Sequence, residues 1–168
     1  MQIIKQKVNW SASVIVATIA IGAVLLATEF FLIRELSYKW DDLIVFAVVI
    51  LALVVLYFAA QSPISIVLTD KQLELKKLLG STVIKRSDIK RIDTYVQDNS
   101  DVRKFGSGGF CGYIGIFANA KIGNYNSYVC NYDQTFLVQT FGGKNYVFSC
   151  QNNDLIINEL KRTKTHIK

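Results

Sequence analysis

The sequence predicts a membrane α-helical hairpin followed by a small β-rich domain of seven to eight antiparallel strands with a C-terminal α-helix. Two stretches near the N-terminus are almost wholly apolar and long enough to cross a bilayer. After residue 61, apolar residues alternate with polar ones, as they do in half-buried strands. Close to the C-terminus the apolar spacing changes to that of an amphipathic helix.

The first apolar stretch runs from about residue 11 to residue 33. At about 1.5 Å per residue, this length is ample for a hydrocarbon core of about 30 Å. Glu29 lies near its end, where a carboxylate can reach the interface, so we expect no intramembrane role for this acid. A cleaved signal peptide is disfavoured, because no small-residue cleavage site follows and a second apolar stretch comes immediately after.

The second apolar stretch, residues 43–60, contains no charged or strongly polar side chain. A globular core of this size has no use for a helix that is apolar on all sides, so we expect it to span a membrane. Residues 34–42 allow only a tight connection, which makes the two spans an antiparallel hairpin with both chain ends on one side. Trp10 and Trp40 flank the first span, as interfacial anchors do.

The distribution of charge indicates the orientation of the hairpin. Positive charges next to the spans are more numerous on the side of the termini than in the connection: Lys5, Lys7, Lys71, Lys76 and Lys77 against Arg34 and Lys39. Since cytoplasmic segments carry the excess of lysine and arginine, we expect both termini and the β-rich domain to lie in the cytoplasm, at the cell membrane.

Residues 62–163 contain a series of short alternating stretches separated by turn residues. The strands expected from this pattern are 64–68, 72–76, 82–86, 89–96, 112–117, 125–130, 136–141 and 145–149. Gly142 and Gly143 indicate a hairpin turn between the last two strands. We expect a meander that closes, or nearly closes, on itself.

The chain then predicts one helix, beginning near Asn153 and followed by a short tail at 164–168. Its apolar face consists of Ile156, Ile157 and Leu160. We expect this face to cover an open end of the barrel.

Three stretches carry a resemblance to a known family. They are Thr69-Asp70-Lys71-Gln72-Leu73, Ser87-Asp88-Ile89, and Gly143 to Ser149 followed by Asn153 to Leu160. In this order they resemble a first-hairpin turn, a later strand start, and the closing hairpin and helix of the bacterial pleckstrin-homology (PH) domain family. The resemblance covers about residues 62–163 and implies a PH-like β-barrel or roll. The turn at Asp70 and Lys71 lacks the long basic loop of many phosphoinositide-binding members, so the resemblance implies little about inositol lipids.

A glycine-rich stretch is the first candidate binding site. It comprises Arg103, Lys104, Phe105, Gly106, Ser107, Gly108, Gly109 and Phe110. Glycines at this density let backbone amides approach a ligand, either a protein or a lipid headgroup, and the two cations suit an anion. The stretch is not a P-loop, because GxxxxGK[ST] is absent. The alternative is a bend or bulge entering a strand, with Phe105 and Phe110 packed over the barrel mouth.

A basic cluster is the second candidate site, for contact with lipid headgroups. It comprises Lys76, Lys77, Lys85, Arg86, Lys90 and Arg91. If Gly80 and Ser81 close a hairpin, Lys76 and Lys77 are expected to lie near Lys85 and Arg86 and to face anionic headgroups. The alternative is a solvated strand edge that resists aggregation.

Other residue patterns disfavour catalysis, metal binding and cofactors. Cys111, Cys130 and Cys150 lack metal-type spacing and are interpreted as reduced, partly buried thiols, while the single histidine, His166, lies in the tail. Asp98 and Asp101 are interpreted as turn formers. The tyrosines are not interleaved with cations, so we expect no nucleic-acid binding: Tyr113, Tyr125, Tyr128, Tyr132 and Tyr146.

Together these patterns predict a non-enzymatic interaction module anchored in the lipid bilayer, with residues 1–61 as the membrane hairpin. We expect it to recruit a protein partner or to assemble a membrane complex. The alternative is peripheral binding of anionic phospholipid by the basic cluster. A channel is disfavoured because the spans offer few polar side chains, and the sequence predicts no particular oligomeric state.

Overall fold

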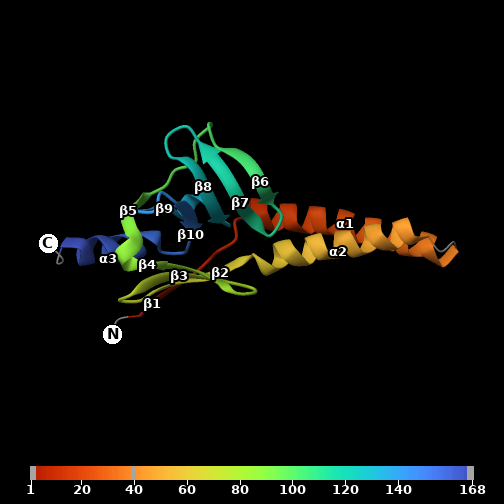
Figure 1. Ribbon diagram of the computed structural model, residues 1–168, viewed down its shortest axis with the longest axis horizontal. Coiled ribbons are helices and arrows are strands. Elements are labelled where there is room, and N and C mark those ends of the chain that lie inside the picture. The colour runs from red at the N-terminus through yellow and green to blue at the C-terminus, as the bar shows by residue number, and fades with distance from the viewer. Residues whose placement is uncertain (1–2, 39–40, 166–168) are drawn as a thin grey trace.

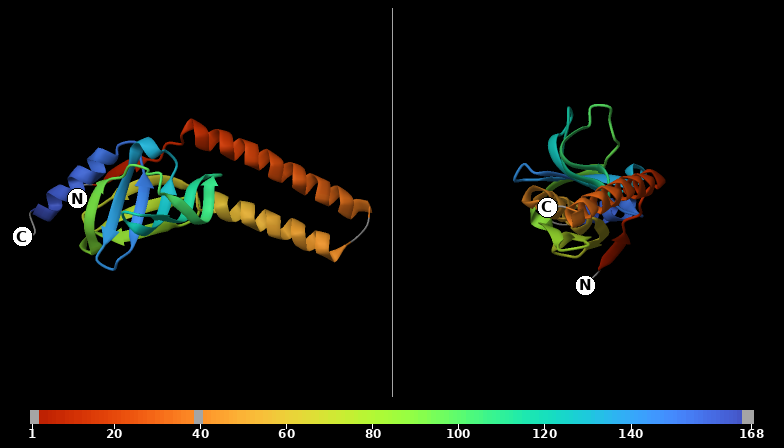
Figure 2. Two further views of the ribbon diagram at one scale, coloured as in Figure 1. Left: turned by 90° about the horizontal axis from the view of Figure 1, so that it is seen from above. Right: turned by 90° about the vertical axis from the view of Figure 1, so that its right-hand side faces the viewer.

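Two long helices extend side by side from one end of a β-rich domain in the computed structural model, which describes residues 3–38 and 41–165 (Figures 1 and 2). They are α1 (Ala12–Tyr38) and α2 (Asp42–Ala60). α1 continues beyond its predicted end at Ile33, because the charged residues that follow still favour helix. Asp41 caps the N-terminus of α2, where its carboxylate accepts the Leu43 N–H at 2.9 Å. Trp40 lies outside the described residues.

Both helices are long and apolar enough to cross a membrane. Val14 is the single buried residue of α1, and no residue of α2 is buried. A core helix of a soluble domain would instead hide one face against its neighbours. The helices therefore present an apolar surface that nothing else in the described chain covers.

A strand that the sequence analysis did not predict precedes the helices. β1 (Ile4–Lys7) pairs antiparallel with β2, with Ile4 opposite Leu68 and Lys7 opposite Ser65. The chain therefore enters α1 and leaves α2 at the same end of the domain. The first sheet has the order β1-β2-β3-β4, with β2 (Pro63–Leu68), β3 (Gln72–Lys77) and β4 (Ser81–Lys85).

Six further strands form the second sheet, in the order β5-β9-β10-β8-β7-β6. Their bounds are β5 (Ile89–Thr94), β6 (Val102–Gly109), β7 (Gly112–Asn119), β8 (Gly123–Val129), β9 (Thr135–Thr140) and β10 (Asn145–Ser149). Short 3-10 turns, η1 (Arg86–Asp88) and η2 (Tyr132–Gln134), precede β5 and β9.

The predicted meander and closed barrel are wrong. In the second sheet the β9–β10 hairpin lies between β5 and β8, and β10 runs parallel to β8. The order of the strands in this sheet therefore differs from their order in the chain. The strands lie in two separate sheets that are not closed on each other. The predicted strand positions hold, and β6 is an additional strand where a loop was expected.

The main core lies between the two sheets and under the last helix, α3 (Asn153–Thr165). Ile156, Ile157 and Leu160 are at most 4% exposed, as the predicted apolar face requires. They share a core with residues of both sheets, including Leu75 and Phe148. α3 lies at the end of the domain away from α1 and α2, so the predicted C-terminal helix and its buried apolar face are confirmed, whereas the barrel whose end it was expected to cover is not closed (Figure 1).

A pair of glycines allows β6 and β7 to approach closely. Gly106 (φ 119°) and Gly115 (φ 135°) are direct cross-strand partners. A Cβ at Gly106 would lie 2.1 Å from the carbonyl oxygen of Ile114, and one at Gly115 would lie 2.2 Å from that of Phe105. The spacing of this hairpin therefore requires glycine at both positions.

The turn of the β6–β7 hairpin is held against α1 by one hydroxyl group. Thr18 Oγ1 accepts the Cys111 N–H at 2.9 Å and lies 2.7 Å from the Val14 carbonyl and 3.2 Å from the Gly109 carbonyl, either of which can accept its proton. Gly109 is also close to Ala17. This contact, which we call the Thr18 clamp, joins the second sheet to the base of the helices.

Replacement of either paired glycine tests the hairpin geometry. We expect Gly106→Ala or Gly115→Ala to lower the free energy of unfolding by roughly 2–3 kcal/mol, since each adds backbone strain and a clash with a carbonyl. The measurement is denaturant unfolding of the detergent-solubilised chain followed by circular dichroism. Gly142→Ala, where the nearest atom is 4.0 Å away, is the control. Equal stability of all three variants would contradict the geometry.

Thr18→Val tests the clamp while keeping the shape of the side chain. The buried Cys111 amide loses its acceptor, which costs about 1–2 kcal/mol and should raise its exchange with solvent roughly tenfold. Hydrogen–deuterium exchange over residues 107–113 measures this. Thr28→Val is the matched control, because Thr28 bonds only to Val24 of its own helix. Unchanged exchange in the Thr18 variant would contradict the clamp.

Candidate functional site

The glycine-rich stretch is an edge strand and turn rather than a loop. Within residues 3–38 and 41–165, β6 pairs with β7 alone, and Ser107 Oγ donates to the Phe110 carbonyl at 2.6 Å, which fixes the turn. The expected bulge is present between Arg103 and Phe105. Phe105, however, is 65% exposed and covers no barrel mouth.

The structure divides the side chains of this stretch between two places. Ser107 and Gly109 are buried at the hairpin turn, whereas Lys104 and Phe105 are exposed. Phe105 lines an opening of about 240 Å³ together with Tyr57 and Phe58 of α2. The Arg103 guanidinium lies over Gly108, beside a crevice of about 250 Å³ between the helices. The crevice is lined by apolar residues that include Ile21, Leu25, Val54, Val55, Phe58 and Phe110.

The basic cluster is not one surface, and the expected proximity across the β3–β4 hairpin is wrong. The turn is Leu78-Leu79, so Lys76 lies opposite Ser81, and Lys85 lies opposite Gln72. Lys85 faces Gln72, and Gln72 lies four residues before Lys76 on β3. Lys76 is therefore roughly 13 Å along the strand from the position that faces Lys85.

The other cations of the cluster are divided between the region near α3 and the end of α2, and most of them have partners within the domain. Arg86 donates to the Thr69 and Glu159 carbonyls, both at 3.2 Å, near α3. Arg91 pairs with Asp93, and Lys90 precedes it in β5. Lys77 donates to Gln61 Oε1 at 2.8 Å at the end of α2, and burial lowers its pKa. Of the six residues of the basic cluster, Lys76 and Lys77 lie nearest to the base of the helices.

A larger opening lies on the other side of this base, where sequence reasoning identified no site. This basal groove, of about 550 Å³, is lined by residues that include Lys5, Lys7, Trp10, Ala59, Pro63 and Ile64. β1 supplies the two lysines, and the segment that leads into α1 supplies Trp10. Because residues 5–10 and 59–65 are far apart in sequence, the unpredicted pairing of β1 with β2 is what forms the groove.

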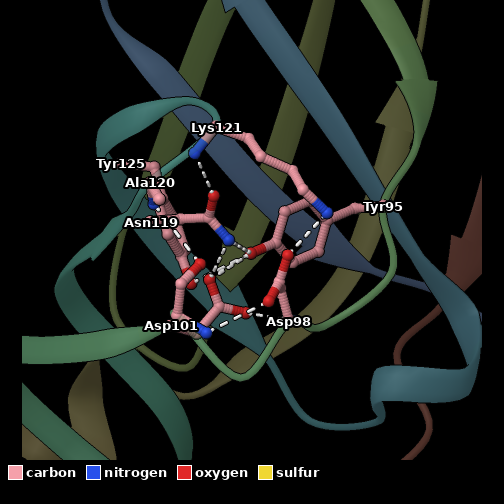
Figure 3. A network of polar contacts seen from close by, with 8 residues as sticks. Tyr95, Asp98, Asp101, Asn119, Ala120, Lys121 and Tyr125 are labelled. Carbon is pink, nitrogen blue, oxygen red and sulfur yellow. Dashed lines mark hydrogen bonds and ion pairs between the residues drawn. The ribbon is translucent and has the colours of Figure 1, made fainter.

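A polar network joins the β5–β6 loop to the β7–β8 turn, at the ends of the strands of the second sheet (Figure 3). Asp101 accepts hydrogen bonds from the Tyr95 hydroxyl and the Asn119 amide, both at 2.6 Å, and its other oxygen accepts the Asp98 N–H at 3.0 Å. Asp98 accepts the Ser100 N–H and pairs with Lys121.

These contacts confirm that Asp98 and Asp101 shape turns. Burial and the bond to Asp101 raise the pKa of Tyr95, so its hydroxyl stays a donor at neutral pH. The network therefore joins the β5–β6 loop to the β7–β8 turn.

The three cysteines are free thiols buried in the domain. Burial raises the pKa of Cys130 and of Cys150 to about 12, and it also raises that of Cys111. All three are therefore protonated at neutral pH and poorly nucleophilic. Among the described residues, no group of three or more His, Cys, Asp or Glu side chains could hold a metal ion; His166 lies outside them.

Comparison with known proteins agrees with the two-sheet fold and its C-terminal helix. A family described as "Bacterial PH domain" matches residues 64–164, which is more than half of the chain. The match begins inside β2, so β1 and both helices lie outside it. No curated protein and no solved structure gives a significant match. The chain therefore belongs to the bacterial PH domain family.

Proposed function

We propose that this protein is a membrane-anchored, non-catalytic interaction module that holds its PH domain at the cytoplasmic face of a bacterial membrane. There it recruits a protein partner or assembles a membrane complex. The observation that carries the proposal is the apolar surface of α1 and α2, which the domain leaves uncovered. Exposure of such a surface to water costs about 25 cal/mol per Å², so hydrocarbon is the favourable medium.

The attachment of the domain supports a fixed position at the membrane rather than a flexible tether. The Thr18 clamp and the pairing of β1 with β2 join both sheets to the base of the helices. Gln61 and Ser62 are the only residues between α2 and β2. A short, bonded junction of this kind presents the same surfaces to every partner.

The edge strand β6 is the surface best suited to a protein partner. Among the described residues no strand lies beside its outer edge, and edges of this kind accept an added strand from another chain. Phe105 and its cross-strand partner Ile116 are both exposed, at 65% and 44%. An exposed aromatic beside an open strand edge offers an anchor together with backbone hydrogen bonds.

The alternative of headgroup binding by the basic cluster has less support. Lys85, Arg86, Lys90 and Arg91 belong to the end of β4, to η1 and to β5, and Figure 1 shows β4 and β5 on the side of the domain near α3, away from α1 and α2. Lys76 and Lys77 lie close to the helices, whereas the other four cations do not. The six residues therefore cannot all contact one flat membrane surface next to the helices. Protein recruitment is therefore the function that we favour.

Single introduced cysteines test the orientation. The native thiols are buried and protonated, so we expect little labelling of the unmodified chain at pH 7. Lys144→Cys, in the β9–β10 turn, should react with a membrane-impermeant maleimide only from the cytoplasmic side, and Ser37→Cys, near the end of α1, only from the other side. Labelling of both from one side, or release of the chain by alkaline carbonate, would contradict membrane spanning.

Co-purification from gently solubilised membranes tests the role of β6. We expect a partner protein to be retained by the full chain and its amount to fall at least several-fold in Phe105→Ser, because the exposed aromatic side chain that the partner would cover is lost. Phe141→Ser, at an equally exposed phenylalanine of the β9–β10 turn, should retain it. A monomer without partners in several detergents, or equal loss in both variants, would count against the proposal.

A further inference from the structure

The basal groove has the size and lining of a binding site for an apolar chain. Its volume of about 550 Å³ falls within the range usual for ligand sites. Val8, Trp10, Ala59, Pro63, Ile64 and Leu78 contribute apolar wall. Ile64 is 48% exposed and Leu78 58% exposed, so much of this wall has no cover within the described chain.

Two cations lie at the side of this groove. Lys5 and Lys7 are two residues apart on β1, so their side chains lie on the same face, roughly 7 Å apart along the strand. Within the described part of the chain, neither makes a side-chain hydrogen bond or ion pair. No acidic residue lines the groove. The nearest acid on this sheet face is Glu74, opposite Val67 and thus two strands away from Lys5.

We propose that the basal groove binds one anionic phospholipid of the surrounding leaflet, with its acyl chain along the apolar wall and its phosphate at Lys5 and Lys7. The inference rests on the proposed insertion of α1 and α2. Given that insertion, Ala59 in the last turn of α2 and Trp10 before α1 lie at the depth of the headgroups, where lipid is the most concentrated ligand. An amphipathic anion matches an apolar groove with cations on one side.

A second copy of the chain fits the groove less well. The base of each domain carries Lys5, Lys7, Lys76 and Lys77 and would repel the same surface of another copy. The site also differs from the basic cluster of β3 to β5, because it is formed by the strand that precedes the helices and by the junction that follows them.

Lipid retention by the full chain tests the site. The protein is placed in nanodiscs of mixed phosphatidylcholine and phosphatidylglycerol, and bound lipid is counted by native mass spectrometry after release. We expect one phosphatidylglycerol to be retained by the unmodified chain and affinity to fall about 30-fold in Lys5→Gln/Lys7→Gln, since each cation contributes up to about a factor of five. Lys85→Gln/Lys144→Gln removes the same charge elsewhere and should retain the lipid.

Filling the groove provides a test that leaves the charges in place. Ile64→Trp should also release the lipid, whereas Val83→Trp, at a position 49% exposed on β4, should not. Circular dichroism of each variant establishes that the fold is kept. Equal retention by the Lys5/Lys7 variant, equal loss in the Lys85/Lys144 control, or preference for phosphatidylcholine would overturn the inference. Release of the chain by alkaline carbonate would instead refute the membrane anchoring itself.

Discussion

The uncovered apolar surface of α1 and α2 is the constraint on which the arrangement of this protein depends. No strand or loop of the domain packs over the length of either helix, and Val14 is the only buried side chain of α1. The domain contacts the helices through the Thr18 hydroxyl, through the segments that adjoin the helix ends, and through β6 and Phe110, which line a crevice with both helices. A hydrocarbon environment for the helices would therefore hold the domain close to a membrane surface and in a defined orientation.

The same attachment determines which surfaces are open to ligands. The turn of the β6–β7 hairpin is used in binding α1, so the glycines that suggested a ligand loop serve close strand pairing and contact with the helix. Two open features are the strand β6, with Phe105, and the basal groove, with Lys5 and Lys7. One suits an added strand of a protein, and the other an amphipathic anion. They lie on different sheets, so both can be occupied together.

The elements predictable from the sequence are those whose signal is local. The spans, the alternation of Ile64 to Leu75 and the apolar face of α3 each depend on spacing within a few residues, and each has the predicted structure. β1 was missed because Ile4 to Lys7 is too short to show a pattern, and its partner lies beyond both helices. β6 was missed because Gly106, Gly108 and Gly109 disfavour strand locally. The close approach of β6 to β7 nevertheless requires glycine at Gly106 and at its partner Gly115.

The sequence by itself determined that this chain has two membrane-type helices, a β-rich PH domain and few reactive groups, because hydropathy, alternation and residue type are properties of neighbouring positions. The tertiary structure alone decided the strand order, the division of the basic cluster and the formation of the basal groove. Each of these depends on pairing between residues far apart in the chain: Lys7 with Ser65, Lys85 with Gln72, and Tyr146 with Asn126. Such pairings are chosen by burial of the whole core, which no local pattern records.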